Sequence, residues 1–261
     1  MKITKQQVYQ NHGIVYDPKT DTITAPIFGQ VKPLLKKGNT KTGKTVYTWS
    51  TLPSNEIFNL VIKGIEYTMQ GTCPCHCEGC YAMTGKYNCS NVLNSLAINT
   101  LLIREHPAFV EAALIAQIEA ENLDSVRIDA AGDIENCMIT VFQNVVKACK
   151  ATKFWTYTKN RKAEAAFDGL ENGNIVKSLT PYGKNYGHCD YILSVYNKLV
   201  QDNESVYICR CGIDKNQHCE NCKGCSNHKY VLFIEHSTAY KAEKDPAFEE
   251  LKTVIEKQPK Q

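Results

Sequence analysis

The sequence predicts an α/β protein in which parallel strands form an open, partial barrel. Strand-like runs rich in β-branched and aromatic residues alternate with helical patterns along most of the chain. Strands joined through helices run parallel, and the five expected here are too few for an eight-stranded closed barrel. The 261 residues, 43% hydrophobic and 22% charged, are enough for one large domain with a full core.

The first half of the chain changes character near residue 56. Before it, the sequence is polar and turn-rich, with short strands expected at residues 14–16, 22–24 and 46–49. After it, we expect a strand over 58–69 and a helical region over 90–121 that His106-Pro107 interrupts. The expected organisation is a β-rich extension (1–55), the partial barrel (56–200), and a cysteine-rich metal-binding region with the last strand and a C-terminal helix (201–261).

The second half continues the alternation. Strands are expected at 125–130, 153–158, 190–196 and 230–234, and helices at about 139–149, 161–170 and 247–256. In barrel-like α/β folds the carboxyl ends of the strands form the site. Here those ends are the first cysteine loop and residues 129–133, 157–160, 194–197 and 235–237, all polar or metal-binding. This coincidence predicts an enzyme.

Cysteine usage indicates metal or redox chemistry. The N-terminus lacks the apolar core of a signal peptide, and no run approaches the roughly 18 apolar residues of a membrane span. We therefore expect a cytoplasmic protein without a membrane partner, in which thirteen cysteines indicate metal sites before disulfides. Five cysteines lie between residues 73 and 89 and five between 209 and 225.

The first cysteine loop has the spacing Cys73-x3-Cys77-x2-Cys80. One compact loop of this spacing presents three thiolates to a [4Fe–4S] cluster and leaves its fourth iron without a protein ligand. Two other interpretations are weighed against it. Structural zinc would need a fourth ligand from Cys75 or His76, and disulfides are disfavoured without a secretory signal.

The second cysteine group, Cys209-x-Cys211-x7-Cys219-x2-Cys222-x2-Cys225, predicts a separate metal site. Its C-x2-C-x2-C core is similar to half of a bacterial ferredoxin motif, and Cys209 or Cys211 would supply the further ligand. An auxiliary [4Fe–4S] cluster would relay electrons or anchor substrate. Structural zinc is the alternative, because the same thiols can close a tetrahedron.

These residues together resemble a known superfamily. A cysteine loop of this spacing after a strand, then a helix, then a strand closed by Ala131-Gly132-Asp133 is similar to the radical S-adenosylmethionine (SAM) enzymes. Asp133 stands where that superfamily has the Glu of Gly-Gly-Glu, and the aromatic Tyr81 follows the third cysteine instead of preceding it. More narrowly, the chain resembles the phage and bacterial family called gene product 88, through Thr72-Cys73-Pro74, Cys80-Tyr81-Ala82, Gly85-Lys86-Tyr87, 125–128 with Gly132-Asp133, 154–158 and 231–236.

The resemblance implies a cofactor and its ligands. Cys73, Cys77 and Cys80 would hold the cluster, whose open iron binds SAM; one electron cleaves SAM, and the resulting 5′-deoxyadenosyl radical takes hydrogen from the substrate. The cofactor-binding residues expected by analogy contact the methionyl amine (Asp133, with the Gly132 backbone), the adenine (Tyr81), and the carboxylate or ribose (Tyr157, Thr158 and Lys159). Asp133 capping the following helix is the alternative. The partners expected are an electron donor such as flavodoxin or ferredoxin and an unknown substrate, with nucleotides or nucleic acid as natural candidates.

A function of a different class is also open. Five lysines lie between residues 32 and 44, and Trp49 follows them. Lysines contact phosphates and a tryptophan stacks on bases, which would suit a zinc- or cluster-stabilised nucleic-acid-binding protein without SAM cleavage. Such a lysine run is also typical of a solvated hairpin.

Overall fold

A computed structural model of the chain describes residues 3–38, 43–75, 80–177, 188–210, 219, 222, 224–234 and 242–258. Its largest sheet has the order β10-β9-β8-β5-β4. The strands are β4 (Lys36–Lys37), β5 (Val46–Thr48), β8 (Ser125–Ile128), β9 (Lys153–Thr158) and β10 (Gly173–Lys177). The strands β5, β8, β9 and β10 run parallel, and β4 pairs antiparallel with β5. The described strands form several sheets and no closed barrel.

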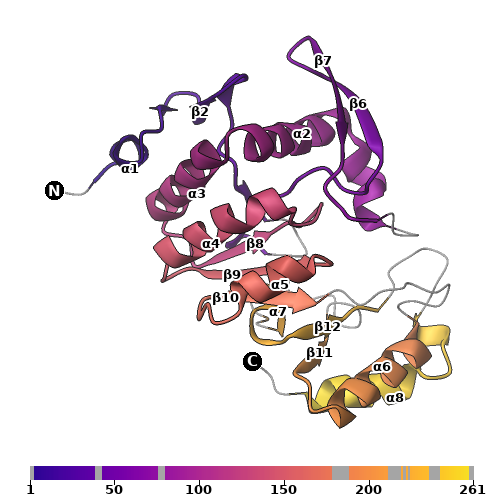
Figure 1. The fold of residues 1–261 in the computed structure, drawn as a ribbon. Helices are drawn as coiled ribbons and strands as arrows, with labels where there is room; N and C mark the ends of the chain where they lie inside the picture. Colours follow the sequence, from indigo (N-terminus) through magenta and orange to yellow (C-terminus); the bar gives the residue numbers. More distant parts are fainter. Residues whose placement is uncertain are drawn as a thin grey trace.

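Helices cover one face of this sheet (Figure 1). They are α2 (Ser90–Glu105), α3 (Pro107–Glu121), α4 (Ile139–Ala148) and α5 (Arg161–Phe167). The expected break between α2 and α3 is confirmed: Pro107 is the first residue of α3, where its missing N–H costs nothing. Alternate strand residues, among them Val126, Ile128 and Phe154, enter the main core with these helices.

Trp49 belongs to this core. Its side chain is 0% exposed, and its ring packs edge-on against Phe142 with the centroids 4.8 Å apart. The suggestion that Trp49 stacks on a nucleic-acid base is therefore wrong, because the ring has no exposed face.

The N-terminal residues pack into the same core. They form α1 (Lys5–Asn11), which the sequence did not predict, and an antiparallel sheet of β1 (Tyr16–Asp17), β2 (Thr22–Ala25) and β3 (Gly29–Val31). Tyr9 and Tyr16 stack with their ring centroids 4.8 Å apart. Tyr9 and Ile23 lie in one buried cluster with residues of α3, so this extension shares the main core.

The strand expected over 58–69 is corrected to a hairpin. Two strands, β6 (Ile57–Ile62) and β7 (Ile65–Gln70), pair antiparallel and lie outside the parallel sheet (Figure 1). Lys63 and Gly64 form the turn with φ of 51° and 82°, and two successive positive φ angles are typical of the tight turn whose twist matches a hairpin. The first cysteine loop follows β7.

The strand expected over 190–196 is wrong: these residues belong to the helix α6 (Cys189–Gln201). The β-branched and aromatic residues favoured a strand, but Cys189, Ile192, Leu193 and Leu199 are buried at helical spacing. The expected strand end at 194–197 therefore lies within a helix, not at the edge of a sheet.

The C-terminal part forms a smaller unit beside β10 (Figure 1). It contains β11 (Val206–Ile208) parallel to β12 (Tyr230–Leu232), the short helix α7 (Gly224–Asn227) and α8 (Phe248–Lys257). The α6 and α8 helices enclose a second small core. The expected last strand and C-terminal helix are thus confirmed as β12 and α8. Within the described residues, none of the helices combines the length and apolar character that a membrane crossing requires.

Replacing Gln117 by Leu tests how the N-terminal part is fastened to α3. The buried Gln117 amide accepts from Leu35 N (2.8 Å) and donates to Leu35 O (2.9 Å). Gln117→Leu should lower the free energy of unfolding by about 1–3 kcal/mol for each group left without a partner. Urea denaturation measures the loss, with Gln10→Leu on the exposed side of α1 as control. Equal stability of the two variants would contradict this role of Gln117.

Candidate functional site

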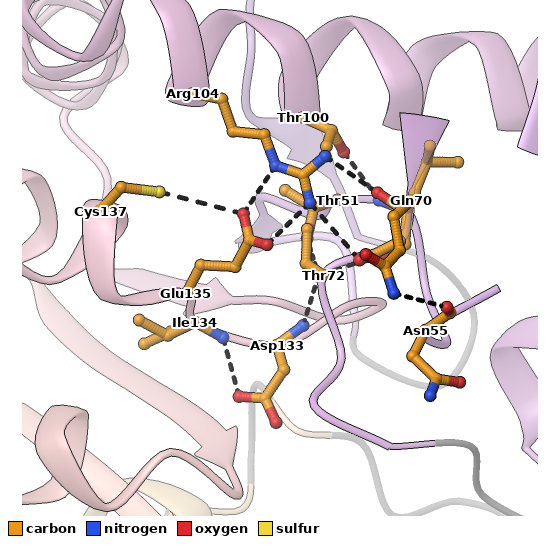
Figure 2. Close-up of polar contacts among 12 residues, drawn as sticks. Thr51, Asn55, Gln70, Thr72, Thr100, Arg104, Asp133, Ile134, Glu135 and Cys137 are labelled. Carbon is orange, nitrogen blue, oxygen red and sulfur yellow. Dashed lines mark hydrogen bonds and ion pairs between the residues drawn. The ribbon is translucent and has the colours of Figure 1, made fainter. Parts of the chain in front are cut away.

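The first site lies at the carboxyl edge of the parallel sheet, where buried hydroxyl groups join three segments. Thr51 follows β5, Thr72 follows β7, and Asp129 follows β8. Thr51 Oγ1 donates to Asp129 Oδ1 at 2.9 Å and lies 2.9 Å from Thr72 Oγ1. Thr72 Oγ1 also accepts from the backbone N–H of Asp133 at 2.9 Å (Figure 2). All four residues are at most 5% exposed, so this network fixes the start of the first cysteine loop.

Gly132 makes that close approach of segments possible. Its φ is +90°, and a Cβ added there would lie 2.0 Å from Thr51 Oγ1 and 2.7 Å from Thr72 Oγ1. Only a residue without a side chain fits both the conformation and the space. The expected role of the Gly132 backbone near the methionyl amine of SAM stays a prediction.

A salt bridge holds the same segments from the α2 side. Arg104 binds Glu135 through two hydrogen bonds, Nε to Oε2 at 2.8 Å and Nη2 to Oε1 at 2.7 Å. Its Nη1 also donates to Gln70 O at 2.9 Å, just before the cysteine loop (Figure 2). A two-pronged Arg–carboxylate contact is more directional than a single ion pair. Arg104 therefore clamps the loop after β7 to the loop after β8.

Cys73 lies inside this arrangement. Its backbone N–H donates to Ser54 O at 3.0 Å, which fixes the first cysteine relative to the hydroxyl network. Burial, with a smaller contribution from the Asp133 carboxylate, raises the pKa of the Cys73 thiol to about 12. Asp129 acts in the same direction, and the Lys159 ammonium opposes it. The partly buried Cys73 thus lies near two buried carboxyl groups.

Asp133 ties the ends of β8 and β9 together. Its Oδ1 accepts from the Thr158 hydroxyl and from Ile134 N (2.7 Å), and its Oδ2 accepts from Lys159 N (3.0 Å). Burial raises the pKa of Asp133, although the bonds from Thr158 and Lys159 act against that shift. The alternative that Asp133 caps the following helix is not what the structure has, because α4 begins at Ile139, after the 3-10 turn η3 (Asn136–Met138).

Tyr157 is placed differently from what the sequence suggested. Neighbouring residues of a strand point to opposite faces of the sheet, so Thr158 faces Asp133 while Tyr157 faces the second cysteine group. The Tyr157 hydroxyl donates to Cys225 Sγ at 2.6 Å. Thr158 and Lys159 thus lie at the first site, and Tyr157 lies at the second.

The second site occupies the face of the sheet opposite the main helices. Cys209 and Cys225 lie in one buried cluster with Val46, Trp155 and Val176, and Cys219 and Cys222 pack against it. Burial raises the pKa of Cys225 to about 12, with contributions from Cys219 and Cys222 in the same direction. The described cysteines of the second group therefore gather on this face of the sheet, and the metal site that their spacing indicates stays a prediction.

Two contacts bring α7 and β11 to the second site. Asn174 Nδ2 on β10 donates to Cys225 O at 2.7 Å. The Tyr207 hydroxyl on β11 lies 3.4 Å from Cys222 Sγ. A Cβ at Gly224 would come within 2.4 Å of the Tyr207 ring, so α7 packs closely on β11 because its first residue is glycine.

Several expected residues lie outside the part of the chain that the structure describes. They are Cys77 of the first site, Cys211 of the second, the side chain of Tyr81, and residues 235–237. Cys80 is described and packs against the main core, and Tyr81 opens the 3-10 turn η1 (Tyr81–Met83).

The structure also gathers residues that the sequence reasoning missed. His188 and Asp190, at the start of α6, and Asp245, before α8, each offer one possible ligand atom, and these three atoms lie within 4.8 Å of one another. Asp245 lies far from His188 and Asp190 in the sequence, so no local pattern predicted that the three residues would meet. In the lysine segment, Lys32 Nζ donates to Thr20 O and Lys36 Nζ to Pro33 O, both at 2.7 Å. These two lysines bind nearby backbone carbonyls.

Two glycine substitutions separate conformation from crowding at the first site. Gly132→Ala and Gly169→Ala each place a side chain at positive φ, which costs about 1–2 kcal/mol. Gly169 has no atom within 4 Å of the added Cβ, whereas Gly132 meets Thr51 and Thr72. Urea denaturation should show a clearly larger loss of stability for Gly132→Ala. Equal losses of stability in the two variants would contradict the crowding at Gly132, because they would show that Thr51 and Thr72 move aside without a loss of stability.

The buried carboxyl of Asp129 gives a pH-dependent prediction for the metal-free protein. Burial, and then the Asp133 charge, raises its pKa well above the unfolded value of about 3.9. The native state then holds the proton more tightly, so this group's stabilisation is lost as pH rises above about 4. Asp129→Asn should therefore lose less stability than wild type between pH 4 and 7.

Urea denaturation across that pH range measures the difference. The exposed Asp168→Asn serves as control and should follow the wild-type profile. Parallel profiles for wild type and Asp129→Asn would contradict a raised pKa at Asp129.

Comparisons with known proteins place this chain in a family. A family model described as gene product 88 matches residues 33–189, more than half of the 261 residues. The match includes the first cysteine loop and the carboxyl ends of β8 and β9, and ends before the second cysteine group. No curated protein and no solved structure matches the chain. The chain therefore belongs to the gene product 88 family.

Proposed function

We propose that this chain is a radical SAM enzyme that uses a [4Fe–4S] cluster at the first cysteine loop to cleave SAM reductively. The observation that carries the proposal is that the partly buried Cys73 lies close enough to the buried carboxyl groups of Asp129 and Asp133, at the carboxyl edge of parallel strands, to interact with them electrostatically. Enzymes with such sheets place their reacting groups at this edge. In this proposal the parallel strands form the partial barrel of that superfamily.

The residues fit a positively charged ligand. A partly buried cysteine thiol lies near two buried carboxyl groups, and the pKa of each is raised because burial disfavours its ionised form. Asp129 Oδ2 is buried and has no hydrogen-bond partner within the described residues. Iron ions offset the charge of a thiolate, and the ammonium and sulfonium groups of SAM are cations that suit a carboxylate-lined site.

Each residue at the edge then has a role. Cys73, Cys77 and Cys80 hold the cluster, and Asp133 orients the methionyl amine of SAM with its remaining acceptor position on Oδ2. Thr158 and the Lys159 N–H hold the Asp133 carboxylate in place. When bound, the cluster supplies one electron to SAM, which yields methionine and a 5′-deoxyadenosyl radical that removes a hydrogen atom from the substrate.

A flavodoxin or ferredoxin would supply the electron, and a nucleotide or nucleic acid is the substrate class that we propose. The alternative of a nucleic-acid-binding protein without SAM cleavage has less support. Its suggested base-stacking residue, Trp49, is fully buried. Two of its five lysines bind carbonyls near them in the sequence.

Anaerobic reconstitution with iron and sulfide, followed by SAM and dithionite, tests the proposal. Wild-type protein should release 5′-deoxyadenosine and methionine in equal amounts, and none without reductant. Cys73→Ala should abolish release because the cluster loses a ligand. Cys89→Ala is the matched control: this exposed cysteine precedes α2 and its side chain makes no capping hydrogen bond there.

Release of 5′-deoxyadenosine at the wild-type rate by Cys73→Ala would contradict the ligand assignment. A reconstituted wild-type protein with a full cluster that leaves SAM intact under dithionite would contradict the enzyme assignment itself.

A further inference from the structure

Trp155 and Tyr157 lie two positions apart on β9 and point to the same face of the sheet. That face carries the second cysteine group, because Trp155 shares a buried cluster with Cys209 and Cys225, and Tyr157 packs against this cluster. The strand therefore presents two aromatic hydrogen-bond donors, an indole N–H and a phenol O–H, toward the second site.

The Tyr157 donor is already engaged and its ring is held on two sides. Its hydroxyl donates to Cys225 Sγ at 2.6 Å. Phe233 packs edge-on against the ring with the centroids 5.4 Å apart, and the Arg127 guanidinium lies 4.9 Å from the ring centroid. These contacts fix the direction of the hydroxyl toward the sulfur.

The Trp155 donor has a different status. Trp155 is only 5% exposed, and its Nε1 is buried without a hydrogen-bond partner in the described part of the chain. Buried N–H groups in folded proteins are nearly always paired, so this one calls for an acceptor. Metal-bound thiolates and the bridging sulfides of an iron–sulfur cluster both accept hydrogen bonds, and a cluster offers more sulfur acceptors than a zinc site. The orphan donor thus fits an iron–sulfur cluster.

We propose that the second cysteine group holds an iron–sulfur cluster and that Tyr157 and Trp155 donate hydrogen bonds to its sulfurs. Tyr157 binds the thiolate of Cys225, and Trp155 binds a bridging sulfide. Both raise the reduction potential of the cluster, because a hydrogen bond to sulfur stabilises the more negative, reduced state. This inference deepens the expectation, drawn from the cysteine spacing, of an auxiliary cluster at the second site, and it does not depend on SAM cleavage at the first site.

The test uses the full chain with Cys73→Ala and Cys80→Ala, so that only the second site can carry a cluster. After anaerobic reconstitution, a redox titration followed by electron paramagnetic resonance measures the midpoint potential. Tyr157→Phe and Trp155→Phe should each shift that potential to more negative values. Tyr230→Phe is the control, because it removes a hydroxyl group from β12. The Tyr230 ring lies near Lys177, and this substitution should leave the midpoint potential unchanged.

The outcomes separate this inference from the SAM proposal. If the variant with Cys73→Ala and Cys80→Ala contains zinc and no labile sulfide, the inference is overturned. The proposal that the wild-type protein cleaves SAM would not be affected by that result. A cluster whose potential stays the same in Tyr157→Phe and Trp155→Phe would overturn the role of the donors alone. Conversely, a wild-type protein that fails to cleave SAM leaves this measurement unaffected.

A further measurement needs no substitution at β9, should either variant fail to bind iron. Electron–nuclear double resonance on the reduced second cluster, in H2O and in D2O, detects exchangeable protons close to the iron. Proton couplings that disappear in D2O are expected from the two donors, and their absence would overturn the proposal.

Discussion

The contact between the hydroxyl groups of Thr51 and Thr72 is the interaction on which the first site depends. It joins the segment after β5 to the residue that precedes Cys73, and the network extends to Asp129 and the Asp133 backbone. Buried polar groups of this kind are costly unless all are satisfied. These hydrogen bonds therefore fix the position of Thr72, where the cysteine loop begins, relative to the parallel sheet. They do so even though the loop follows a hairpin that lies outside that sheet.

The strand β9 connects the two cysteine sites. Thr158 binds Asp133 on the side of the first site, and its neighbour Tyr157 binds Cys225 on the other face. Residues that are adjacent in β9, Tyr157 and Thr158, therefore contact the two different sites.

The parts of the fold that follow from local sequence were predicted well. Pro107 fixed the break between two helices, and the apolar runs of β8 and β9 gave strands where they were expected. Two of the errors arose where local preference and tertiary packing differ. The run 190–196 has the residues of a strand but buries its apolar side chains at helical spacing, and the turn Lys63-Gly64 divides what reads as one long strand.

The sequence suggested candidate metal ligands but not their surroundings. Cysteine spacing is a local pattern, so the sequence alone predicts two metal sites, and both stay predictions. The partnership of Arg104 with Glu135 and the meeting of Thr51 with Asp129 join residues 31 and 78 positions apart, which no local pattern reveals. Tyr157 was assigned to the first site because the sequence does not show which face of β9 it occupies.

The most direct test of the central claim is whether SAM binds the first cluster. Replacing Cys222 and Cys225 by Ala leaves the first loop as the cluster site to be measured. The electron paramagnetic resonance spectrum of the reduced cluster should then change when SAM is added, because under the proposed function SAM would coordinate the iron that lacks a thiolate. Superimposable spectra with and without SAM would contradict the account.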